Sequence, residues 1–261
     1  PKNKEDDFFF RISWPTFIEQ LEINHSTNPL NNLIKSLIFF NYFEKNDKYQ
    51  DNVETFLNYH DKNNYWEYCK FLMDILKSNW EKDEENSTYG KFLLPNISEI
   101  NTLLNNFTID QKKYKEQYSE NKKNYTGLKD KPLMKLDKDF YNVINWNFIN
   151  NKFYEGLIFD FYKHSNINSK SKFKTFPDFK NFVANEITER FLFRKILKHL
   201  LNDKYSKLEF DNDKEDGFPD AYYRKGKYIY IFEIKDAYFP SASIDSYNYE
   251  RIKESIDQKY N

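Results

Sequence analysis

The segment Gly217–Lys235, with the sequence GFPDAYYRKGKYIYIFEIK, constrains the fold of this chain more than any other stretch. It contains two strand candidates, Phe218–Tyr223 and Tyr228–Lys235, in which β-branched and aromatic residues dominate. Between them lies RKGK, where Gly226 can take the positive φ of a tight hairpin turn. We therefore expect these strands to pair antiparallel. Because both faces of the second strand are apolar up to Phe232, we expect a central strand covered on both sides.

The end of this hairpin carries charged residues where the pattern predicts burial. Glu233 and Lys235 end the second strand, and Asp220 stands across the hairpin from them. Buried charges lose their hydration, so each of them needs a partner. Two carboxylates a few ångströms apart repel each other, and a divalent cation between them reverses the balance. The pattern therefore indicates a site for a hard metal ion with oxygen ligands, Mg²⁺ or Mn²⁺.

A helix and a strand are expected before the hairpin. Pro177-Asp178 is typical of a helix start, and apolar residues then recur at helical spacing as far as Leu200. On a period of 3.6, one apolar stripe of this helix is interrupted by Glu186 and Glu189. These glutamates either pair with nearby arginines at the edge of the stripe or contribute to a site. A strand is expected near 205–210.

Together these residues resemble the signature of a known enzyme family. Pro219-Asp220, a gap of twelve residues, and Glu233-Ile234-Lys235 at the end of a hydrophobic strand are similar to the motif of the PD-(D/E)xK nucleases, the restriction-endonuclease-like superfamily. The order of elements is similar as well, with a glutamate-bearing helix, a strand, the hairpin and a helix expected over residues 244–260. The family core continues to a further strand that would lie beyond Asn261, so we expect the core to be incomplete at its C-terminus.

The resemblance implies a role for each residue of the motif. Asp220 and Glu233 would be metal ligands for Mg²⁺ or Mn²⁺, with the backbone carbonyl of Ile234 as a third ligand. Lys235 would hold or activate the attacking water, and Glu189 would complete the metal shell directly or through water. The implied reaction is metal-assisted hydrolysis of phosphodiester bonds by a Mg-dependent endodeoxyribonuclease, with DNA expected rather than RNA.

The remainder of the chain is mainly helical in pattern. Apolar residues recur at three- and four-residue intervals over Val53–Trp80, and only two of the five glycines precede residue 150, which disfavours a turn-rich β architecture. The polar segment 164–174 is a candidate domain boundary. We therefore expect an α/β protein, with a helical recognition, regulatory or interaction region over 1–165. A restriction-endonuclease-like core, a mixed sheet flanked by helices, is expected over 172–261.

Composition limits the other possibilities. Aromatic residues make up 20% of the chain, so we expect rings to supply most of the core. The net charge of −1 carries no global signature of a nucleic-acid binder, although the segment 110–131 interleaves Lys and Tyr, as either a nucleic-acid contact or a solvated linker would. The single cysteine, Cys69, is expected in the core and fits a reducing cytoplasm. No apolar stretch predicts a membrane span.

Two functional classes stay open at this stage. The first is a metal-dependent nuclease that binds nucleic acid, acts as a homodimer or in a larger complex, and belongs by analogy to a bacterial restriction or antiviral defence system. The second is an inactive nuclease-like scaffold or binding protein whose helical region is its main interface. The intact set of Asp220, Glu233 and Lys235 favours the first. The four histidines share no metal-binding spacing and are expected at surface or capping positions.

Overall fold

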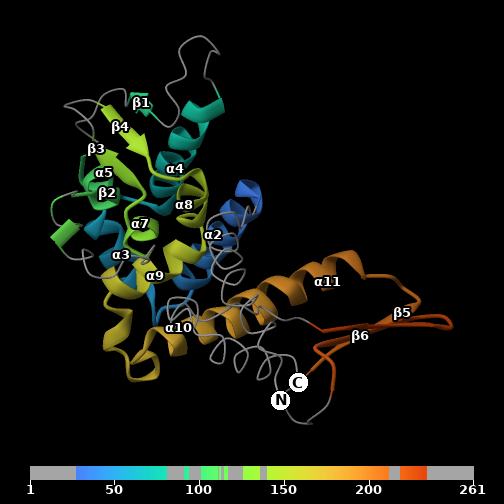
Figure 1. The fold of residues 1–261 in the computed structure, drawn as a ribbon. Coiled ribbons are helices and arrows are strands. Elements are labelled where there is room, and N and C mark those ends of the chain that lie inside the picture. The colour runs from blue at the N-terminus through green and yellow to red at the C-terminus, as the bar shows by residue number, and fades with distance from the viewer. Residues whose placement is uncertain are drawn as a thin grey trace, which may run out of the picture. The chain divides into compact units, whose positions relative to one another are not determined.

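A computed structural model of the chain describes residues 28–80, 91–93, 101–110, 112, 115–116, 126–135, 140–211 and 218–233. The chain divides between Lys170 and Ser171 into two compact units, and this point lies inside the polar segment 164–174 (Figure 1). The described residues form helices and two β-sheets, so the protein mixes both kinds of structure as expected.

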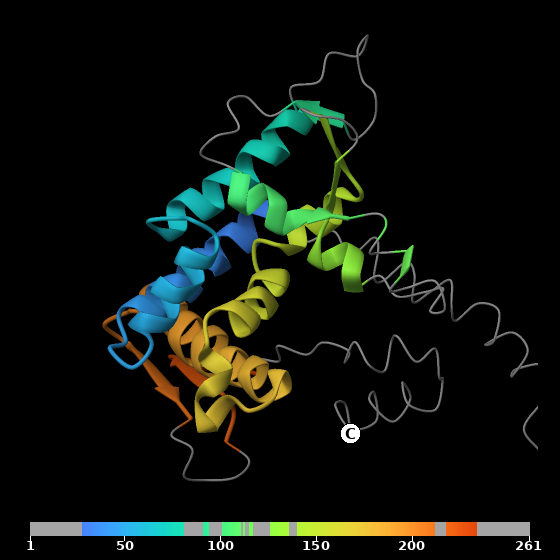
Figure 2. The ribbon, with the colours of Figure 1, turned by 90° about the vertical axis from the view of Figure 1, so that its left-hand side faces the viewer.

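The first unit is mainly helical. Its helices are α2 (Pro29–Glu44), α3 (Gln50–Tyr59), α4 (Tyr65–Trp80), α5 (Asn101–Phe107), α7 (Thr126–Asp130), α8 (Trp146–Asn151) and α9 (Glu155–His164), followed by the 3₁₀ turn η2 (Ile167–Ser169). Helix α2 contacts α3 and α4, and α3 contacts α9, so these helices lie side by side (Figure 2). The helical stretch expected over 53–80 is interrupted after α3, where Asp61 has a φ of 54°.

Aromatic rings fill the core of this unit, as the composition predicts. Phe39 and Phe43 of α2 lie 5.1 and 5.0 Å from the ring of Phe161 in α9, centroid to centroid. Phe56 of α3 lies 5.3 Å from the same ring. All four rings are fully buried. Each such ring removes a large apolar area from water, which compensates for the low aliphatic content of the chain.

The first unit also contains a small sheet that the sequence pattern did not predict. Its strands are β1 (Lys91–Leu93), β2 (Thr108–Ile109), β3 (Leu133–Lys135) and β4 (Phe140–Val143). Their order is β1-β4-β3-β2, and β2 pairs parallel to β3 while the other pairs are antiparallel. The region is mainly helical as expected, and the strands went unpredicted because strands of two to four residues are too short to show a two-residue alternation.

The second unit begins with a long helix in three segments. After the turn η3 (Ser171–Phe173) come α10 (Phe176–Phe182), the π-helical segment η4 (Val183–Phe193) and α11 (Arg194–Leu200). Thr175 caps the start by accepting a hydrogen bond from the Asp178 N–H, as expected for a helix beginning near Pro177. The expected 3.6-residue stripe is wrong at its C-terminal end, where Leu200 is 70% exposed. The reason is the π-helical segment, whose hydrogen bonds span five residues and shift the phase of the faces.

A three-stranded antiparallel sheet follows this helix. Its strands are β5 (Ser206–Phe210), β6 (Ala221–Lys225) and β7 (Tyr228–Phe232), in the order β5-β6-β7. The hairpin is confirmed, since Ala221 pairs with Phe232 and Lys225 with Tyr228. Gly226 has a φ of 60° at the first position of the two-residue loop, the sign and place that a type II′ turn requires. The first strand was expected at 205–210 and is confirmed.

The expected place of the second hairpin strand is wrong. Among the described residues β7 lies at the edge of the sheet, and β6 is the central strand. Ile229 and Ile231 are 55% and 68% exposed, so β7 is not covered on both sides. A run of apolar residues cannot by itself tell a covered strand from an exposed one, because burial depends on what packs against it.

Two further expectations concern single features of the chain. Cys69 is buried in α4 beside the hydroxyl of Ser36, so its predicted place in the core is confirmed. Of the helices in the described part of the chain, none combines the length and the apolar content needed to cross a bilayer. The helix expected over 244–260 and the C-terminal completion of the core lie outside the described residues.

Candidate functional site

Three acidic residues line up across one end of the three-stranded sheet. The register pairs Phe210 with Ala221 and Ala221 with Phe232. One residue beyond these pairs stand Asp211, Asp220 and Glu233, which we call the acidic row. The Asp211 N–H donates to the Asp220 carbonyl at 3.3 Å, which continues the ladder into this row. Asp220 and Glu233 each stand one residue beyond the last pair, Ala221 with Phe232, so they lie at the same end of neighbouring strands, and their convergence on a metal ion stays a prediction.

The acidic row lies on the face of the sheet that the helix does not cover. Side chains alternate between faces along a strand, so the row is on the opposite face from Phe210, Ala221 and Phe232. The Phe232 ring contacts Phe193 at 6.2 Å, which places the helix against that other face. We call the face that carries the acidic row the open face. It also carries the residues Lys207, Glu209, Tyr222, Arg224, Ile229 and Ile231.

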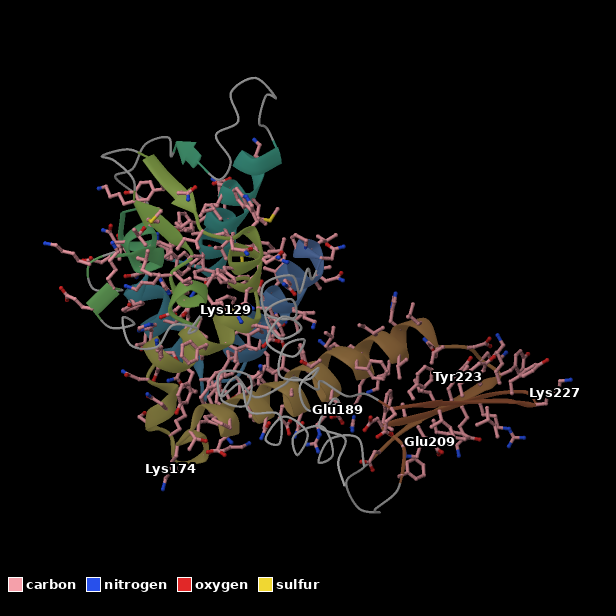
Figure 3. All side chains as sticks on the ribbon, viewed as in Figure 1. Lys129, Lys174, Glu189, Glu209, Tyr223 and Lys227 are labelled. Carbon is pink, nitrogen blue, oxygen red and sulfur yellow. The ribbon has the colours of Figure 1, made fainter. Side chains whose placement is uncertain are left out.

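An arginine ties the glutamate-bearing helix to the acidic row. Arg194 Nη2 donates to the backbone carbonyl of Asp211 at 2.9 Å. The Arg194 backbone N–H donates to the backbone carbonyl of Glu189, a hydrogen bond within the helix that does not involve the Glu189 carboxylate. Glu189 is half-buried on η4 (Figure 3). Glu186 instead pairs with Arg190 at 2.8 Å on the helix surface, which confirms the first interpretation for that glutamate.

The structure corrects one premise of the predicted metal site. Glu233 is exposed, so it needs no compensating partner on account of burial. Ile234 and Lys235 lie outside the described residues. Within the described ranges, no three His, Cys, Asp or Glu side chains are gathered as they would be around a metal ion, and this includes the three residues of the acidic row. The ligand types in the acidic row are carboxylate oxygens, which suit Mg²⁺ or Mn²⁺.

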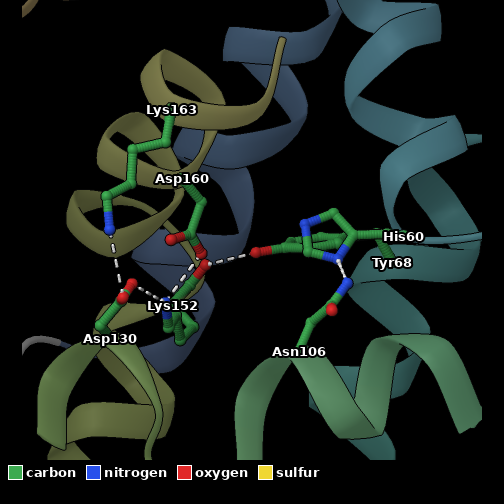
Figure 4. Close-up of polar contacts among 7 residues, drawn as sticks. All are labelled: His60, Tyr68, Asn106, Asp130, Lys152, Asp160 and Lys163. Carbon is green, nitrogen blue, oxygen red and sulfur yellow. Dashed lines mark hydrogen bonds and ion pairs between the residues drawn. The ribbon is translucent and has the colours of Figure 1, made fainter. Parts of the chain in front are cut away.

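A second group of polar residues was missed by sequence analysis and lies inside the first unit. Lys152, the C-cap of α8, places Nζ 2.8 Å from Asp160 Oδ2 and 3.4 Å from Asp130 Oδ1. Lys163 lies 3.3 Å from the other oxygen of Asp130 (Figure 4). We call these four residues the ionic cluster. It joins α7, α8 and α9. Residue spacing in the sequence does not predict it, because Asp130 is 22 residues from Lys152.

The centre of the ionic cluster is closed to solvent. The side chains of Lys152 and Asp160 are 1% and 4% exposed. Burial raises the pKa of Asp160 to about 6, against the opposing attraction of Lys152. Burial acts on Asp130 in the same direction, but the attraction of Lys152 and Lys163 outweighs it and lowers the pKa of that carboxyl. The Lys152 ammonium also lies 5.0 Å from the centre of the Phe107 ring, a cation–π distance.

A buried histidine stands beside this cluster. The Asn106 side-chain amide lies 3.2 Å from His60 Nδ1, and the amide nitrogen can only donate, so Nδ1 accepts and the proton sits on Nε2. Burial, with smaller contributions from the charges of His164 and Lys152, lowers the pKa of His60 to about 3. His60 is the C-cap of α3, a capping position as expected, but it is buried rather than exposed.

The ionic cluster is better explained as a structural element than as a reaction centre. Lys152 is compensated by two carboxylates, His60 is neutral near pH 7, and the Tyr68 hydroxyl donates to the Lys152 carbonyl at 3.4 Å. The contacts of Lys152 and Tyr68 satisfy buried groups and connect helices that are distant in sequence, while the buried Nε2 of His60 has no hydrogen-bond partner among the described residues. The acidic row, by contrast, meets solvent on the open face. It is therefore the candidate functional site.

No protein-family model matches this chain, and neither the curated proteins nor the solved structures contain a match to it. The assignment of the site therefore rests on the residues and the geometry described above.

Proposed function

We propose that the protein is a metal-dependent nuclease that hydrolyses phosphodiester bonds, with DNA as its expected substrate. The observation that carries this proposal is the acidic row. Asp220 of the Pro-Asp motif and Glu233 of the Glu-Ile-Lys motif each stand one residue beyond the Ala221–Phe232 pair, and Asp211 adjoins Asp220 through a backbone hydrogen bond. The side chain of Arg194, five residues after Glu189 along the helix, donates to the Asp211 carbonyl, so the helix that carries Glu189 contacts the end of the sheet where the acidic row stands.

Each residue has a proposed role in this chemistry. Asp220 and Glu233, with the Ile234 carbonyl, would hold Mg²⁺ or Mn²⁺, and Glu189 would complete the shell. When bound, the ion supplies Lewis-acid polarisation of the phosphate and makes hydroxide available near neutral pH. Lys235 would orient the attacking water and balance the negative charge that develops on the phosphate oxygens.

The cellular role belongs to the same proposal. A cytoplasmic nuclease of this kind would fit a bacterial restriction or antiviral defence system, acting as a homodimer or in a larger complex, and this part rests on analogy of type. The first unit would then serve recognition, regulation or interaction, because its described residues form helices around an aromatic core and a closed ionic cluster.

The test compares two matched changes of Asp to Asn at opposite ends of the same sheet. Asp220→Asn should abolish cleavage of plasmid and linear DNA in Mg²⁺ or Mn²⁺. Asp203→Asn should retain it, because Asp203 pairs with Lys225 at the hairpin end. The parent should melt at a higher temperature in Mg²⁺, since an ion that binds only the native state stabilises it, and Asp220→Asn should lose that rise.

The opposite results would favour the inactive scaffold. A parent that neither cleaves DNA nor responds to Mg²⁺ or Mn²⁺ in its melting would exclude the nuclease. If Asp220 is a metal ligand, Asp220→Asn in metal-free buffer should be as stable as the parent or slightly more so, because it removes repulsion within the acidic row. A loss of stability in that variant would favour the scaffold.

A further inference from the structure

We propose that the open face of the sheet is a nucleic-acid track, on which cations at the hairpin end hold phosphates of the strand whose scissile phosphate lies at the acidic row. The cations are Lys207, Arg224 and Lys227. This inference rests on the proposed nuclease function for the position of the scissile phosphate, and on the sheet alone for the position of the binding surface.

The pleat places the cations and the acidic row on one face. Asp220, Tyr222 and Arg224 alternate along β6, so their side chains leave the sheet on the same side. Lys207 of β5 stands directly opposite Arg224. Lys227 lies in the loop at the tip of the hairpin (Figure 3).

The charge at the hairpin end is strongly basic for this chain. Among the described residues of β5, β6, β7 and the turns next to them, Lys204, Lys207, Arg224, Lys225 and Lys227 stand at this end, with Asp203 and Glu209 as the acidic residues. The whole chain has a net charge of −1, so cations are concentrated at this end of the sheet relative to the rest of the chain. Nucleic acid is the partner that this charge fits, because exposed Lys and Arg side chains neutralise backbone phosphates and release the counter-ions bound to them.

The ion pairs at this end do not block such an exchange. Lys207 lies 2.6 Å from Glu209 and Lys225 lies 2.5 Å from Asp203, and both lysines are more than half exposed. Exposed pairs of this kind contribute little to stability, so a phosphate can replace the carboxylate at small cost.

The spacing along the sheet fits a nucleic-acid backbone. Arg224 stands four positions after Asp220, which is about 13 Å at roughly 3.3 Å per strand residue. A duplex carries a phosphate about every 3.4 Å of its axis on each strand, so the track has the length of about four base-pair steps. Tyr222 and the exposed Ile231 lie between the two ends, and the exposed Ile229 lies opposite Arg224, which gives the track an apolar surface suited to sugars and bases.

The experiment measures binding in the full chain carrying Asp220→Asn, in EDTA, so that cleavage does not interfere. Fluorescence anisotropy with labelled 20-nucleotide duplex DNA, single-stranded DNA and RNA would be recorded over a series of salt concentrations. Adding Arg224→Gln and Lys227→Gln should weaken binding of the preferred nucleic acid about tenfold or more. For a duplex, the negative slope of log K against log salt should become less steep by about 2, because two phosphate contacts are lost. Adding Lys45→Gln and Lys48→Gln, two exposed lysines three residues apart in the first unit, should change neither quantity.

The outcomes separate this proposal from the one it rests on. Unchanged affinity and salt slope in the Arg224 and Lys227 variant, with the parent still cleaving DNA, would overturn the track and leave the nuclease standing. Weakened binding in that variant, with a parent that never cleaves in Mg²⁺ or Mn²⁺, would support the track and overturn the nuclease. Ile231→Lys adds a cation to the track and should strengthen binding. If it instead dissociates a dimer seen by sedimentation and leaves nucleic-acid binding unchanged, the open face is a protein interface and the proposal is wrong.

Discussion

Replacing Lys152 by Met should destabilise the first unit strongly at neutral pH. The ammonium is 1% exposed and compensates Asp160 at 2.8 Å and Asp130 at 3.4 Å. Met keeps the apolar stem and removes the charge, so the change leaves Asp160 buried without its closest partner. Breaking a buried pair in this way costs about 3–5 kcal/mol of the free energy of unfolding. At about 2–4 °C per kcal/mol for a unit of this size, the melting temperature should fall by about 6–20 °C.

The size of this loss should depend on pH in a defined direction. Asp160 already has a pKa raised to about 6 by burial, and losing Lys152 raises it further. Between pH 6 and that higher pKa, the folded variant binds a proton that the folded parent does not. The deficit should therefore shrink as the pH falls toward 6, by at most about 1.4 kcal/mol per pH unit. Below pH 6 the two proteins protonate Asp160 alike, so the deficit should level off.

Urea denaturation of the full chain at pH 8, 7, 6 and 5 would measure these free energies. Lys163→Met is the matched control, because Lys163 also pairs with Asp130 but is 41% exposed, and its loss should cost at most about 1 kcal/mol. The double change Lys152→Met and Asp160→Leu should recover most of the loss, since it removes both charges. A loss below about 1 kcal/mol for Lys152→Met, or a double variant less stable than the single one, would refute the reasoning.

Two further predictions concern His60 and Lys235. The pKa of His60 is about 3 in the folded chain, against 6.5 for an ordinary histidine, so between these values the unfolded chain binds the proton and the parent loses stability as pH falls. The free energy of unfolding of the parent should fall by about 5 kcal/mol through His60 between pH 6.5 and 3. His60→Gln should not show this loss. In urea titrations, the difference in stability between the parent and the variant should therefore narrow as the pH falls. A gap that is constant with pH would contradict the neutral, buried state of His60. Lys235→Ala should bind DNA and Mg²⁺ but cleave on the order of 10²-fold more slowly or worse, and full activity in single-turnover assays would show that its assigned role is wrong.

Local sequence was sufficient for the elements that local chemistry specifies. The hairpin followed from two apolar runs around Gly226, whose φ of 60° is a conformation that glycine adopts without steric cost. The helix start followed from Pro177-Asp178, and the structure adds a cap in which Thr175 and Asp178, three residues apart, exchange hydrogen bonds. The antiparallel register then placed Asp220 and Glu233 at the same end of the hairpin, one residue beyond the Ala221–Phe232 pair, because pairing within a short hairpin is set by its turn.

The tertiary structure alone decided which of these residues are buried and which distant groups meet. The apolar run of β7 is exposed at an edge, and Glu233 with it, because burial depends on neighbouring elements that strand periodicity does not encode. Asp211 was not predicted as part of the candidate site. Its backbone N–H donates to the Asp220 carbonyl, and the strand pattern does not fix which residues on either side of the connection between β5 and β6 meet in this way. Lys152 and Asp130 meet because helices far apart in sequence pack together, and a charge can be buried only where such packing supplies its partner.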